Sequence, residues 1–82
     1  MDKSVKLLEQ AFSECTESQF KEVLEQYQEL SGPDEKIPDN PKELAKEMIS
    51  YMEKEYWPKN IEEAREFVFT HILVYGFGGQ RR

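Results

Sequence analysis

The chain has 82 residues, and its 17 acidic side chains against 11 basic ones give a formal net charge of −6 at pH 7. A chain of this length forms one small domain, and because only 38% of its residues are hydrophobic, the aromatic side chains must supply much of the core volume. The acidic balance argues against a general phosphate-binding surface, since nonspecific affinity for nucleic acid comes mainly from Lys and Arg. One cysteine permits no intramolecular disulfide, and no run resembles a signal peptide or a membrane span, so we expect a soluble, cytoplasmic protein.

The first predicted helix is followed at once by the start of a second. Apolar residues recur at helical spacing over residues 3–12 and predict a helix there. Beyond it, Thr16 followed by Gln19 fits a capping box, and Cys15 and Phe20 occupy the positions of a hydrophobic staple around the same helix start. This pattern gives Cys15 a structural role.

A second helix is predicted over residues 17–31, with its apolar face towards the core. Gly32 can adopt the left-handed conformation just past the helix end, and Pro33 prevents the helix from continuing. The acidic, proline-containing stretch that follows predicts a loop. On the side away from the apolar face, the helix carries an acidic stripe formed by Glu22, Glu25 and Glu29.

The clearest helix start in the chain is Asn40 followed by Pro41 and Glu43: a capping side chain, a proline at the first helical position and, two residues later, an acid expected to cap in return. A third helix is therefore predicted over residues 41–56. Pro58 ends it, because a proline disfavours helical geometry in the residue before it.

The last predicted helix covers the most apolar part of the chain. Asn60 with Glu63 repeats the Asn-x-x-Glu start, and apolar residues at helical spacing continue over residues 61–75. Many residues of 67–75 are β-branched or aromatic and also suit a strand or a contact between subunits, so that alternative stays open. Glycines then end the helix, and residues 77–82 are expected to form a flexible tail.

These elements predict an all-α fold, in which residues 1–82 form a single domain built as a small bundle of about four short helices. The chain shows no internal repeat, low-complexity block or domain boundary. Self-association stays open, because the other helices of so short a chain can leave part of the apolar surface of the last helix unburied, where a second copy could pack.

The sequence offers no constellation for catalysis, for a cofactor or for a metal ion. A metal site needs clustered ligands, and the chain has one His and one Cys, far apart in the sequence. Cys15 is expected in the staple, and His71, on an apolar helix, is expected to be a core histidine with satisfied hydrogen bonds. The glycines after the fourth helix precede no further helix that would help to hold a phosphate. We therefore expect neither an enzyme nor a metal or cofactor site.

Protein binding is the function class that remains, and we expect an adaptor, inhibitor or regulator that acts by binding another protein. The alternative is a nucleic-acid-binding transcriptional regulator that dimerises through the fourth helix and presents the third. Nucleic acid is the less expected partner, because no predicted helix is rich in basic side chains. No membrane association is expected.

Three surfaces are candidates for the partner. The corner between the third and fourth helices gathers aromatic and methionine side chains, which are common in interfaces and in cores, so both roles stay open; Trp57 is expected to be partly exposed. The predicted tail places a phenylalanine ahead of two arginines, and the acidic stripe would steer a basic partner. The candidate residues are Tyr51, Met52, Tyr56 and Trp57 in the corner, Phe77 in the tail, and Glu22, Glu25 and Glu29 in the stripe.

Overall fold

Four helices follow one another in the part of the chain that the computed structural model describes, residues 2–74. They are α1 (Asp2–Ser13), α2 (Glu17–Ser31), α3 (Pro41–Tyr51) and α4 (Ile61–Glu66), with a short 3₁₀ turn, η1 (Lys54–Tyr56), after α3 and a π-helix, η2 (Phe67–Ile72), directly after α4. No strand occurs among these residues, so the predicted all-α class is confirmed. The predicted tail, 77–82 with Phe77, lies outside the described residues.

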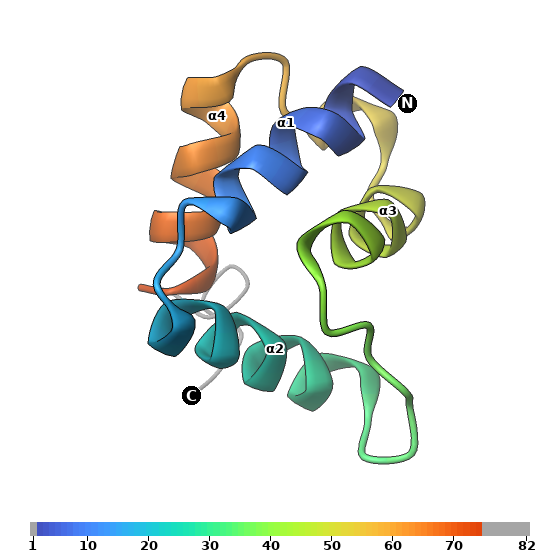
Figure 1. The fold of residues 1–82 in the computed structure, drawn as a ribbon. Helices are drawn as coiled ribbons and strands as arrows, with labels where there is room; N and C mark the ends of the chain where they lie inside the picture. The colour runs from blue at the N-terminus through green and yellow to red at the C-terminus, as the bar shows by residue number, and fades with distance from the viewer. Residues whose placement is uncertain (1, 75–82) are drawn as a thin grey trace.

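The helices are arranged around α1 (Figure 1). α1 packs against α3 and against α4, and α2 lies at the other end of the bundle, where it contacts η2. Buried side chains from all four helices and from η2 meet in one core. The largest side chains that are almost fully shielded from solvent are Leu8, Phe12, Val23, Leu44, Ile49, Val68 and Ile72.

The predicted helix starts are confirmed at the level of individual hydrogen bonds. The hydroxyl of Thr16 accepts a bond from the backbone N–H of Gln19 at 3.1 Å, and the Gln19 side chain accepts one from the N–H of Thr16 at 2.9 Å, which completes the capping box. The side chain of Asn40 accepts a bond from the N–H of Glu43 at 2.9 Å. Such bonds satisfy backbone donors that have no partner within the helix.

The end of α2 is fixed by Gly32. Its backbone has φ 105° and ψ 156°, which is positive as predicted but lies beyond the left-handed helical region, in a conformation open almost only to glycine. The N–H of Gly32 donates to the carbonyl oxygen of Gln28 at 2.8 Å. The side-chain amide of Gln28 donates in turn to the carbonyl oxygens of Gly32 and Glu35, so one residue of α2 holds the first turn of the loop.

The third helix ends at Tyr51, so the prediction of a helix over residues 41–56 is wrong for its last five residues. Trp57 accounts for the difference, because its indole N–H donates to the carbonyl oxygens of both Ile49 and Met52, each at 3.1 Å. In a continuous α-helix, these two oxygens would accept backbone N–H groups four residues further along. The chain instead leaves the helix and makes the separate turn η1.

The fourth helix changes its winding halfway. α4 ends at Glu66, and η2 continues it with wider turns, in which the N–H of Leu73 donates to the carbonyl oxygen of Val68, five residues back, at 3.1 Å. The predicted helix over residues 61–75 is thus helical up to Ile72, and the strand alternative is wrong for η2. π-helical segments are rare and often lie at functional sites.

Candidate functional site

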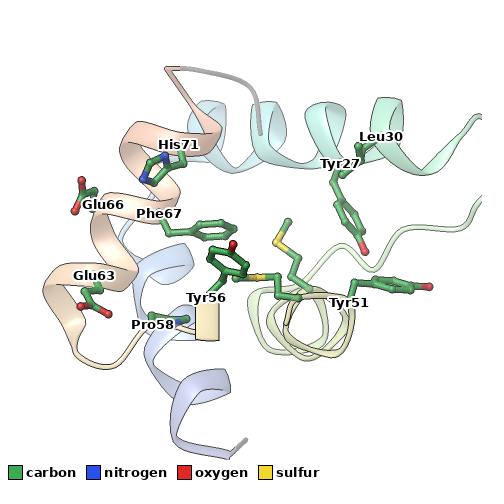
Figure 2. A pocket seen from close by; sticks show the side chains of 11 residues that line it. Tyr27, Leu30, Tyr51, Tyr56, Pro58, Glu63, Glu66, Phe67 and His71 are labelled. Atoms are coloured by element: carbon green, nitrogen blue, oxygen red, sulfur yellow. The ribbon is translucent and has the colours of Figure 1, made fainter. Parts of the chain in front are cut away.

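A groove with a volume of about 810 Å³ lies between two walls of the bundle (Figure 2). One wall consists of the C-terminal parts of α2 and α3, and the other consists of α4 and η2. η1 and Pro58 lie between the walls. The lining side chains are Tyr27, Leu30, Met48, Tyr51 and Met52 on the first wall, Tyr56 and Pro58 between the walls, and Glu63, Glu66, Phe67 and His71 on the second.

The groove gathers most of the large hydrophobic side chains that the described chain exposes. Leu30 is 55% exposed, Tyr51 74% and Tyr56 66%. Val74 is the other exposed large hydrophobic residue among residues 2–74, and it does not line the groove. Single exposed hydrophobic side chains are common on small domains. Several of them around one groove form an apolar surface patch, and such patches often mark interaction sites.

Below these exposed side chains the groove is lined by residues of the core. Met48 is 2% exposed and Pro58 is buried, whereas Met52 and Phe67 are half-buried and pack against the core. Figure 2 shows Phe67 pointing from η2 into the groove. Two of these residues are methionines, whose flexible and polarisable side chains adapt to irregular apolar surfaces.

The wall formed by η2 corrects the prediction for His71. His71 is exposed and lines the groove, so the expectation of a core histidine is wrong. Val68 and Ile72 take the core face of η2, and Phe67 and His71, also four residues apart, lie on the neighbouring groove face. The rings of Phe67 and His71 are tilted by 44°, with centroids 6.4 Å apart.

Acidic side chains occupy one wall only. Glu63 and Glu66 are exposed and lie one helical turn apart on α4, and no Lys or Arg occurs among the described lining residues. Glu63 is held in place at the helix start: its N–H donates to the side chain of Asn60, and its carboxylate accepts from the N–H of Lys59, each at 2.9 Å. The predicted Asn-x-x-Glu start is therefore present, with the carboxylate bound one residue before the cap.

Tyr27 gives the α2 side of the groove a fixed, uncharged polar group. Its side chain is 4% exposed, and its hydroxyl donates to the carboxylate of Glu47 at 3.1 Å. Burial, and then the negative charge of Glu47, raise the pKa of the Tyr27 phenol above its ordinary value. Tyr27 therefore keeps its proton at any physiological pH.

The structure divides the predicted partner residues into groups. Tyr51, Met52 and Tyr56 line one groove, as the corner hypothesis requires for a contact surface, whereas Trp57 is half-buried and bonded to the end of α3. The stripe of Glu22, Glu25 and Glu29 is exposed on α2 but does not line the groove, and Phe77 lies outside the described residues.

Three apolar or aromatic residues that line the groove, Leu30, Phe67 and His71, are not predicted as binding residues from the sequence. Leu30 continues the apolar stripe of α2, which predicts the core face, and His71 is a possible member of the stripe of the last helix. Phe67 is not part of that stripe, and the sequence marks it only as one of the aromatic and β-branched residues of 67–75. Leu30 is nevertheless 55% exposed, which the periodicity of α2 does not report.

The structure also locates the chain's one thiol. Cys15 is half-buried between α1 and α2, and its thiol donates to the carbonyl oxygen of Ala11 at 3.8 Å. Burial, and then the charge of Glu14, raise the pKa of the Cys15 thiol, which keeps it in the less reactive protonated form. Cys15 does not line the groove.

Two further observations concern residues 2–74 as a whole. They contain no group of three or more His, Cys, Asp or Glu side chains placed to hold a metal ion. None of their helices has both the length and the apolar composition needed to cross a membrane. The lining residues themselves give the groove an adaptable apolar surface along its length and negative charge along one edge.

Comparisons of this chain with models of protein families, with curated proteins and with solved structures found no match in any of the three.

Proposed function

We propose that this chain binds another protein through the groove between α2–α3 and α4–η2, and that it acts as an adaptor, inhibitor or regulator without chemistry of its own. The observation that carries this proposal is the position of Leu30, Tyr51 and Tyr56, all more than half exposed, around one apolar groove. Tyrosines anchor protein interfaces more often than most residues do, because their rings bury a large area at a low cost in side-chain entropy.

The exposed rim favours a protein over a small molecule. A volume of about 810 Å³ is within the range of small-molecule pockets, so volume alone does not decide. However, a small ligand held at the level of Met48 and Phe67 would leave Tyr51 and Leu30 in water. A protein segment would cover both the interior and the rim, and so would remove more apolar area from solvent.

The nucleic-acid alternative gains no support from the groove. Its charged lining residues are Glu63 and Glu66, and these would repel a phosphate backbone. The groove therefore favours a partner that brings apolar side chains and, at one edge, positive charge.

The test is affinity capture from extracts of the native cells, with three baits compared. The wild-type chain should retain a partner that Y51A/Y56A loses, because the double substitution removes the two most exposed aromatic rings of the groove. V74A is the matched control, since Val74 is also an exposed apolar residue but does not line the groove, and it should retain the same partner. Circular dichroism of each bait checks that its helices are intact.

A photo-crosslinking amino acid at position 56 should then attach to this same partner, and one at Lys21, exposed on α2 away from the groove, should not. Equal recovery of the partner by wild type and Y51A/Y56A would sink the proposal.

A further inference from the structure

We infer that the segment bound in the groove is an amphipathic α-helix with Lys or Arg side chains one turn apart along one flank. This inference rests on the proposed function and specifies the chemistry of the partner. It follows from three features: the absence of a sheet edge among residues 2–74, the adaptable apolar interior of the groove, and the confinement of charge to one wall.

The secondary structure of the groove favours a helical occupant over an extended one. An extended peptide usually binds by adding a strand to a sheet edge, where the peptide backbone finds hydrogen-bond partners. Residues 2–74 contain no strand, and both walls of the groove are helices, whose backbone groups are bonded internally. A helix satisfies its own backbone and can place an apolar face in such a groove without leaving buried N–H and C=O groups unpaired.

The interior of the groove suits the apolar stripe of a helix. Met48 and Met52 can adjust to the uneven surface that residues at positions i, i+3, i+4 and i+7 present, and Phe67 and Tyr56 offer ring faces for branched aliphatic side chains. Leu30 and Tyr51 lie on the first wall, across the groove from Phe67, and their exposed side chains would cover one side of the bound helix.

The charges give the bound helix a preferred flank. Glu63 and Glu66 both belong to α4, whereas Leu30 and Tyr51 on the opposite wall are uncharged. Figure 2 shows Glu66 on the side of α4 opposite Phe67, so this charge lies at the outer edge of the groove. Because three residues of an α-helix rise by about 4.5 Å, a partner helix lying along α4 meets the two carboxylates with side chains one turn apart on its own surface. The bond from the N–H of Lys59 fixes the Glu63 carboxylate before any partner arrives.

The experiment uses the full chain and three synthetic peptides of equal length as probes. Two of them carry leucines at i, i+3, i+4 and i+7 and differ only in one flank, which holds lysines in the first and glutamates in the second. The third is a proline-rich peptide, which adopts an extended helix without internal hydrogen bonds. Binding is measured by fluorescence anisotropy of the labelled peptides, and its location by the ¹³C-methyl NMR signals of Met48 and Met52.

We expect the lysine peptide to bind about tenfold more tightly than the glutamate peptide at low salt, and the ratio to fall as salt is added, since exposed charges contribute modestly and are screened. The signals of Met48 and Met52 should shift on binding. In E63Q/E66Q, which keeps the side-chain volumes and the acceptor for the N–H of Lys59, the preference should nearly vanish. E22Q/E25Q removes the same charge outside the groove and should retain the preference.

Three results would overturn the inference: equal affinity for the lysine and glutamate peptides, tighter binding of the proline-rich peptide, or binding that leaves the signals of Met48 and Met52 unchanged. They leave the proposed function intact as long as the natural partner is lost with Y51A/Y56A. Conversely, if no natural partner depends on those tyrosines, the proposed function fails whichever peptide binds. The two experiments therefore separate an error about the site from an error about its ligand.

Discussion

Arg65 and Glu14 join α4 to the chain just after α1 by two parallel hydrogen bonds. Nε of Arg65 donates to one carboxylate oxygen at 2.8 Å and Nη2 to the other at 2.9 Å, across 51 positions of sequence. The paired geometry matches the planar guanidinium to the planar carboxylate. Both side chains remain substantially exposed, so the pair orients the two elements more than it stabilises them.

The Arg65–Glu14 pair predicts a pH-dependent part of the stability. The hydrogen bond from Arg65 holds the pKa of the Glu14 carboxyl below its usual range. A carboxyl whose pKa is lowered by folding stabilises the fold above its unfolded-state pKa of about 4.3, and this contribution is lost as the pH falls from there through the lower folded pKa.

Urea unfolding should therefore show E14Q to be slightly less stable than wild type at pH 7, with the difference gone at pH 2. E17Q is the control, because it removes the same charge from another exposed acid close by, at the start of α2. A difference between E14Q and wild type that is the same at both pH values would contradict the role of the charge.

Trp57→Phe should destabilise the fold although it keeps an aromatic ring. The substitution removes the N–H that donates to the carbonyl oxygens of Ile49 and Met52 and leaves them without that donor. Loss of a partner for a half-buried polar group costs about 1–3 kcal/mol. Thermal unfolding followed by circular dichroism measures the effect, and Y56F, at an exposed ring one residue earlier, should change the midpoint little.

Gly32→Ala should also destabilise the chain, by about 1–3 kcal/mol, because a side chain at φ 105° is strained whatever space surrounds it. No heavy atom lies within 4 Å of the Cβ that alanine would add, so the cost comes from the backbone conformation alone. Chemical denaturation of G32A beside E35A, a substitution at an exposed position of the same loop, separates this strain from a general effect of changing the loop. An unchanged stability of G32A would show that the backbone can relax at this position.

Cys15 should react slowly with thiol reagents in the folded chain. Burial and the charge of Glu14 both raise the pKa of the thiol, so less thiolate is present at pH 8 than in a free cysteine. Modification by a disulfide reagent should be several-fold faster in urea than in buffer, and E14Q should accelerate the reaction in buffer. Equal rates with and without urea would show that the folded environment does not protect the thiol.

The parts of this fold that follow from neighbouring residues could be predicted from the sequence. Thr16 with Gln19, and Asn40 with Glu43, each form their cap within one turn, so the helix starts need no knowledge of the rest of the chain. The class of the fold followed from the same signals together with the apolar spacing.

The features that depend on packing could not be predicted in this way. α3 ends at Tyr51 because Trp57 folds back on it, and no propensity of residues 52–56 reports that contact. His71 is exposed and lines the groove from η2, a π-helical segment that the apolar spacing does not distinguish from an α-helix. The corner residues Tyr51, Met52 and Tyr56 could be singled out because their side-chain chemistry is informative whatever their position on a helix.

The double use of Glu63 constrains how this protein can vary. Its carboxylate both fastens the start of α4, through the N–H of Lys59, and supplies half of the negative charge along the groove. A substitution that removes the acceptor weakens the helix start even if the partner has no need of the charge, so retention of Glu or Gln at this position would not by itself report selection for binding. Glu66 has only the second role, and a natural variant that carries Glu63→Gln but keeps the acid at position 66 would reveal which of the two demands acts on the chain.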